Sequence, residues 1–199
     1  MDTKLKVNSK IIFGTFFTSL FLLIYGCSPS GILATGGGTA MVVAEGDRSL
    51  GTVVDDATVK INIAAKFLNA GNNLFVDINT TVLEGRVLLT GLVDNQELRI
   101  EAVRLVWEIE GVREVINEIE IGNREGIKDY AKDLWINTQA RGVAAKTLGL
   151  RAVAYNFETI NGKIYVAGVT SKPEQLDILI DSLKSIKGVK EIINYVIVK

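Results

Sequence analysis

Along the chain, hydrophobic residues follow helical spacing in some segments and alternate with polar residues in others. The same series of segments occurs twice. In the first half, apolar residues recur at helical spacing, then alternate with polar residues through two short runs, and then repeat the cycle. The pattern predicts the order helix, strand, strand, helix, strand. The expected elements are helices over about 57–70 and between Asn95 and Gly111, and strands over 75–83, 86–93 and 115–121.

The second half of the chain repeats the order with its own residues. The expected elements are a helix over about 129–147, strands over 151–159 and 163–170, a helix that starts at Pro173, and a strand over 190–198. Proline suits the first turn of a helix because its missing N–H has no partner there. Glu84-Gly85 and Asn161-Gly162 predict the two hairpin turns.

Corresponding glycines of the two halves stand at one constant offset. Gly85 and Gly162, Gly91 and Gly168, and Gly111 and Gly188 are each 77 positions apart. A constant offset predicts two copies of one small α+β fold, in tandem. We expect each copy to be an αββαβ module, with a three-stranded mixed sheet packed on two helices. The link 122–126 is short, and each core is small, so we expect the modules to pack against each other.

The N-terminus has the pattern of an export signal. Lys4, Lys6 and Lys10 precede an apolar run over 11–25, which suits a signal-peptide core and is short for a membrane span. The sequence ending at Cys27 resembles a bacterial lipobox, which implies a signal peptide over 1–26 and an acylated Cys27. The alternatives are a signal peptide without acylation or an N-terminal anchor helix. Residues 27–46 contain a run of glycines and read as a flexible tether.

The composition argues against several classes of function. The chain has no His and one Cys, which removes the commonest general base and any Cys-rich metal site. Its net charge of −1 disfavours nucleic-acid binding. We therefore expect no catalytic residues, no metal and no cofactor. The adjacent Asp55 and Asp56 are interpreted as a helix cap, and the second copy has Lys132-Asp133 there, so the pair of carboxylates is not repeated.

The two copies differ most on the first helix of the second one. Projection at 100° per residue places Trp135 beside the core stripe, on a face rich in lysine, where the first copy has Thr58. The polar members of this face are Lys128, Lys132, Gln139 and Lys146. A tryptophan flanked by lysines suits the interface of a membrane that contains anionic lipid. The alternatives are a contact between Trp135 and the first module or the tether, and ordinary burial.

The motifs quoted above resemble those of BON domains, which are named after bacterial osmotically inducible and nodulation-associated proteins. The resemblance covers about 47–199 and implies one domain over 47–122 and another over 123–199. Tandem BON domains behind a lipobox are similar to outer-membrane lipoproteins that face the periplasm, and Ser28 after the cysteine is consistent with sorting to that membrane.

In that group the first helix of the second domain is implicated in contact with anionic phospholipid, and Trp135 and Arg141 match the pattern. The resemblance thus implies a non-enzymatic lipoprotein that supports envelope integrity. The alternative is an adaptor that docks on an envelope protein or assembly factor. The sequence does not fix the lipid, the protein partner or the oligomeric state.

Overall fold

The computed structural model describes residues 49–122 and 127–199. The predicted signal peptide, Cys27 and the tether lie outside these residues. The first module consists of α3 (Leu50–Ala70), α4 (Leu74–Asp77), β1 (Ile78–Leu83), β2 (Arg86–Val93), α5 (Gln96–Trp107) and β3 (Glu114–Ile121). The second consists of α6 (Ile127–Leu148), the 3₁₀ helix η2 (Gly149–Ala154), β4 (Tyr155–Ile160), β5 (Lys163–Thr170), α7 (Pro173–Lys184) and β6 (Glu191–Val198).

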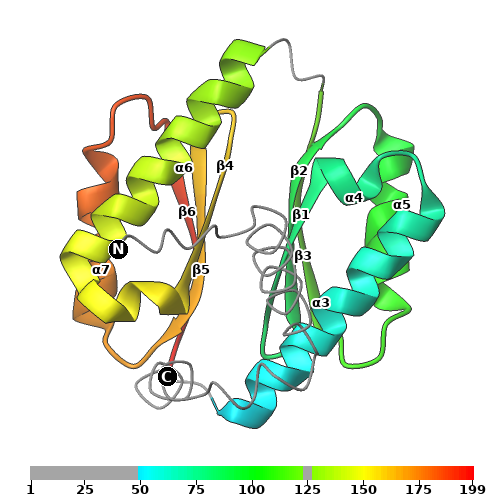
Figure 1. Cartoon of the computed structure of the whole chain (residues 1–199), viewed down its shortest axis with the longest axis horizontal. Helices are drawn as coiled ribbons and strands as arrows, with labels where there is room; N and C mark the ends of the chain where they lie inside the picture. The colour runs from blue at the N-terminus through cyan, green and yellow to red at the C-terminus, as the bar shows by residue number, and fades with distance from the viewer. Residues whose placement is uncertain (1–48, 123–126) are drawn as a thin grey trace, which may run out of the picture. The chain divides into compact units, whose positions relative to one another are not determined.

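Each module contains one mixed three-stranded sheet, as predicted. The middle strand, β2 or β5, pairs antiparallel with the strand before it and parallel with the last strand of its module. The two long helices of each module lie along its sheet (Figure 1). The registers are equivalent as well, since Val87 pairs with Val115 and Ile164 pairs with Ile192. The two copies therefore have the same fold, strand by strand.

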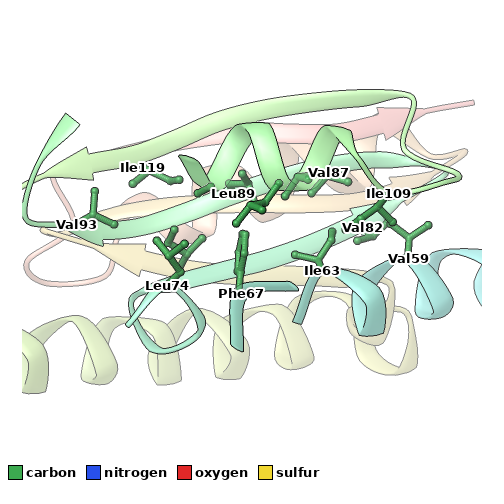
Figure 2. Packing of buried hydrophobic residues seen from close by; sticks show 14 residues of the cluster. Val59, Ile63, Phe67, Leu74, Val82, Val87, Leu89, Val93, Ile109 and Ile119 are labelled. Carbon is green, nitrogen blue, oxygen red and sulfur yellow. The ribbon is translucent and has the colours of Figure 1, made fainter. Parts of the chain in front are cut away.

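The first core lies between the helices and one face of the sheet. Figure 2 shows Val59, Ile63 and Phe67 in a row along α3, facing strand residues that include Val87 and Leu89. Phe67 is 2% exposed and Ile63 is fully buried. Burial of one such side chain contributes about 1.5–3 kcal/mol. This row is the apolar stripe whose spacing predicted the helix.

The second core fills the same space with a different distribution of side-chain size. Ala144 stands at the position of Phe67, 77 residues later, and Phe157 on β4 stands at the position of Thr80 on β1. Both Ala144 and Phe157 are buried. The large aromatic ring of the core thus comes from the helix in the first module and from the sheet in the second. A packed core tolerates best those exchanges that conserve its total volume.

A third buried cluster contains residues from both sheets. Its buried members are Leu83 and Leu88 of the first sheet and Ile160, Tyr165 and Ala167 of the second, with Ile116, Ile193, Tyr195 and Ile197 packed around them. Leu88 and Tyr165 are equivalent positions of the two copies. The modules thus share apolar contacts through their sheets, in agreement with the packing that the short link predicts.

Several predicted bounds need correction. Helix α3 begins at Leu50, not near 57, because the side chain of Ser49 caps it by accepting a hydrogen bond from Thr52 N at 3.2 Å. The chain just before β1 and just before β4 is helical, in α4 and η2, where we predicted strand. The exposed Phe75 and Val76 gave the appearance of strand alternation, but Leu74 is the buried residue of that turn.

The glycines that follow α5 and α7 lie beyond the ends of these helices, although we expected the first helix to extend to Gly111. Helix α5 ends at Trp107 and α7 ends at Lys184, so Gly111 and Gly188 are not helix C-caps. Each glycine has φ of +92°, a conformation that favours glycine, in the turn that leads to the last strand. The carbonyl oxygen of Gly111 lies 2.8 Å from the place where a Cβ on Gly85 would be. These glycines therefore allow two turns to approach closely.

Candidate functional site

The face of α6 that contains Trp135 is open to solvent. Helix α6 is fixed to its module by Ile136, Ala140 and Ala144, which are fully buried. Trp135 directly precedes Ile136 and points about 100° away from it around the helix, and it is 47% exposed. Figure 1 shows α6 as a long helix beside the second sheet. The indole is thus neither a core residue nor enclosed by other described residues, and its contact with lipid stays a prediction.

Most polar residues of the predicted site surround this tryptophan. Lys132, Gln139 and Lys146 are all exposed and fall within about 60° of Trp135 at 100° per residue. The side chain of Lys128 lies outside the part of the chain that the structure describes. This face combines one large amphipathic ring with cationic side chains, and none of the described members is a carboxylate.

Arg141 is exposed as well but lies on another side of α6. At 100° per residue it lies about 120° around the helix from Trp135, and its Nη2 donates a hydrogen bond to the carbonyl oxygen of Phe157 at 3.2 Å. Burial raises the pKa of the neighbouring Glu158, and the charges of Arg141 and Lys60 oppose this increase. Arg141 therefore ties α6 to β4, and its charge partly offsets the effect of burial on the pKa of Glu158.

A carboxylate locks α6 to the hairpin of its own module. Asn161 N and Gly162 N donate hydrogen bonds to the two oxygens of Asp133, at 2.7 and 2.8 Å. In the first module, Glu84 N and Gly85 N donate to Asp56 in the same way, at 2.8 and 2.9 Å. The hydrogen bonds to these two aspartates form what we call the hairpin lock.

The hairpin lock corrects our reading of the aspartates. Asp56 lies inside α3 and is 6% exposed, so it does not cap the helix. Asp133 occupies the equivalent position 77 residues later, so this carboxylate is a repeated device although the pair Asp55-Asp56 is not. The offset of 77 residues between Asp56 and Asp133 could have indicated that this carboxylate is repeated. We overlooked it because the residue before it changes from Asp55 to Lys132.

The described residues contain neither a cluster suited to a metal ion nor a helix suited to span a membrane. Within residues 49–122 and 127–199, no three or more His, Cys, Asp or Glu side chains gather as they would to hold a metal ion. None of the helices described there has the length and apolar character needed to cross a membrane.

The fold and the hairpin lock define a class of protein, built from two copies of one αββαβ module in tandem. The family model of the BON domain matches residues 55–123 and again 132–199, and the chain belongs to this family.

Relatives extend over most of the chain. The outer membrane lipoprotein DolP of Haemophilus influenzae is 29% identical over 173 residues, which is 86% of this chain and 88% of that protein. A 21 kDa hemolysin of Actinobacillus pleuropneumoniae is 30% identical over 153 residues, 75% of this chain and 78% of the relative. A protein of Anaplasma centrale, described by its place in the gshII 5′ region, is 36% identical over 147 residues, 73% of this chain and 96% of the relative.

Proposed function

We propose that this protein is a non-enzymatic lipoprotein of the outer membrane, anchored through Cys27 and facing the periplasm. In this proposal α6 contacts anionic phospholipid through the face around Trp135, and the contact supports envelope integrity. The relative of Haemophilus influenzae is called an outer membrane lipoprotein, and the lipobox-like sequence before Cys27 is consistent with the same anchor. The observation that carries the proposal is the exposed Trp135 among lysines on a helix whose other side is fixed in the core.

The physical argument rests on the two kinds of side chain on this face. An indole ring is favoured at the level of lipid headgroups because it joins an apolar body to a polar N–H. Lysines near an anionic surface each contribute about 1 kcal/mol of attraction. The whole chain has a net charge of −1, so a general attraction to an anionic surface is not expected. Binding must therefore come from a local patch, and the Trp135 face is one.

The test uses vesicles and the chain from residue 27 onward with Cys27→Ser, which removes the anchor. We expect co-sedimentation with vesicles of phosphatidylcholine that contain phosphatidylglycerol, and much less with phosphatidylcholine alone. Trp135→Ala should reduce this binding. The matched control is Trp107→Ala, because Trp107 lies on α5 of the first module and is 53% exposed. Equal binding to both vesicle types, or equal loss in both variants, would contradict the proposal.

Fluorescence gives an independent measurement at the same residue. The chain has two tryptophans, so Trp107→Phe leaves Trp135 as the only one. We expect its emission to shift to shorter wavelength when anionic vesicles are added, because the indole enters a less polar environment. The opposite variant, Trp135→Phe, reports on Trp107 and should show no shift.

A protein-docking role is the second candidate, and an observation on α3 favours it. Val54, Ile61 and Leu68 recur every seven residues and are 60%, 68% and 59% exposed. Residues at this spacing lie on one face of a helix, and an exposed aliphatic stripe is typical of a surface that meets another protein. If the adaptor role is the main one, Ile61→Lys should impair function in cells while vesicle binding stays negligible in every variant.

A further inference from the structure

The end of each module that holds the hairpin turn differs in charge between the two copies. In the first module this end has a hollow of about 500 Å³. Among its lining residues are Asp55 and Thr58 of α3, Glu84 of the hairpin, and Glu110 and Arg113 around the turn after α5. Three of these five residues are acidic, and one is basic.

Three of the five equivalent positions of the second module are basic, and none is acidic. Lys132 stands at the position of Asp55, Lys187 at that of Glu110 and Lys190 at that of Arg113, each 77 residues later. Asn161 replaces Glu84, and Trp135 replaces Thr58. Of the carboxylates at this end, Asp133 accepts hydrogen bonds from two hairpin amides, and Glu120 of the first module accepts one from Asn161. Glu191 lies beside Lys163 on the neighbouring strand. The second module thus has two lysines and an asparagine where the first has three acidic residues, keeps one basic position, and adds an indole.

The lysines come from different elements but meet at the same two glycine turns. The Cε atom of Lys132 on α6 is 3.3 Å from the place where a Cβ on Gly188 would be. The Cγ atom of Lys190 is 3.3 Å from the corresponding place on Gly162, and the carbonyl oxygen of Gly188 is 3.0 Å from it. Lys187 directly precedes Gly188 in the chain. The bare glycines therefore let the lysine stems lie close to the turns.

The three lysines also have their charges available. Lys132, Lys187 and Lys190 are exposed, and none of them forms an ion pair with another residue in the described part of the chain. Lys163 and Lys184, by contrast, are paired with Glu120 and Asp181 at 2.9 and 2.8 Å. Adjacent cations without counterions repel one another, and a bound anion removes that repulsion.

We propose that Lys132, Lys187 and Lys190 form a site for the phosphate of an anionic phospholipid headgroup, with Trp135 beside it in the headgroup layer. This inference rests on the proposed function and adds a second element, the turn between α7 and β6, to the contact surface of α6. The site takes lipid phosphate because the indole supplies an apolar contact that a free phosphate ion would not use. It belongs to the second module alone, because the first module has Asp55 and Glu110 at two of the three equivalent positions.

The test compares two double variants in the chain from residue 27 with Cys27→Ser. The first is Lys187→Glu with Lys190→Glu. The control is Arg151→Glu with Lys172→Glu, which changes the charge equally at the opposite end of the same module, where β4 begins and β5 ends. We expect the first variant to bind phosphatidylglycerol-containing vesicles at least about tenfold more weakly, since each lysine contributes a few-fold. The control should bind within about twofold of the unaltered chain.

The second variant is Lys187→Gln with Lys190→Gln. It removes the two charges without adding carboxylates, so it separates loss of lipid binding from misfolding caused by the Glu substitutions. It should lose less affinity than the Glu variant and keep the circular dichroism and unfolding midpoint of the unaltered chain. Inorganic phosphate at matched ionic strength serves as the competitor. It should leave binding unchanged, whereas displacement of the protein from vesicles would show a site for free phosphate and overturn the lipid assignment.

The outcomes separate this inference from the proposal on which it rests. If the Glu variant binds like its control while Trp135→Ala loses binding, the lysine site is wrong and the proposed function stands. If the unaltered chain does not prefer anionic vesicles, the proposed function fails and the site fails with it. Support requires loss in both the lysine variants and Trp135→Ala.

Discussion

Tyr195 donates a hydrogen bond through its hydroxyl group to the carboxylate of Glu118, its own counterpart in the first module. The two residues are 77 positions apart and stand at equivalent places on β6 and β3. When a residue contacts its own repeat equivalent, the copies are related by an approximate twofold axis that passes near the contact. The other strand contacts between the modules agree, because β1 meets β5 and β2 meets β4. The tandem repeat thus resembles a dimer joined into one chain.

This contact makes the module interface sensitive to alkaline pH. Burial and the adjacent Glu118 raise the pKa of Tyr195 to about 12 from an ordinary value of 10.0. The neutral phenol is therefore the form that the folded state favours, and its contribution is complete below pH 10. We expect the free energy of unfolding to fall as pH rises from about 10 to 12. Urea unfolding across this range should show a smaller fall for Tyr195→Phe, and an equal fall would contradict the assignment.

A second contact between the modules predicts sensitivity to acid. Burial by itself would raise the pKa of Glu120, but hydrogen bonds from Lys163, Asn161 and Tyr165 and the charge of Lys163 hold it below the usual value. The Lys163 Nζ and Asn161 Nδ2 atoms lie 2.9 and 2.7 Å from its carboxylate oxygens. Because the folded pKa is lowered, this stabilisation is present above the ordinary pKa of a glutamate and is lost as pH falls through the lowered value.

The variant that checks the acid prediction is Glu120→Gln. It should be less stable than the unaltered chain at neutral pH and nearly equal to it in acid, as measured by denaturant unfolding at both pH values. Glu97→Gln on α5 is the control, since Glu97 is exposed. A stability difference that does not narrow toward low pH would show that Glu120 acts through packing and not through its charge.

The hairpin lock predicts a strong effect from a single carboxylate. Asp56→Ala leaves the amides of Glu84 and Gly85 without their acceptor, and loss of a hydrogen bond to a charged group costs about 1.5–3 kcal/mol. Asp133→Ala should cost less, because Asp133 is half-buried whereas Asp56 is 6% exposed. Thermal unfolding of both variants measures the difference. Asp55→Ala, on the exposed side of α3, should change the midpoint little.

The two central strands show what the sequence predicts well. Strands 86–93 and 163–170 were predicted with their observed bounds, because a glycine turn sets each start and apolar residues fill both faces.

The hairpin lock was missed, since it joins residues 28 and 29 positions apart and no local pattern reports such a contact. The hydrogen bond from Arg141 to Phe157 was also not predicted, because it joins a helix to a strand that only the fold brings together. Lys187 and Lys190, which we propose as part of the lipid site, were not predicted because only the fold brings their turn close to α6 and the hairpin.

The residues that distinguish the second module from the first can be tested by introducing them into the first module. Asp55→Lys, Thr58→Trp and Glu110→Lys together give the first module the residues that the second has at these positions. All three positions are exposed, so the fold should tolerate the changes. In a chain that also has Trp135→Ala, we expect this transplant to restore binding to phosphatidylglycerol-containing vesicles. Thr58→Trp alone is the control and should restore much less, because the indole then lies among carboxylates. Equal recovery with the single change would mean that the ring alone determines binding and that the lysines beside it add nothing.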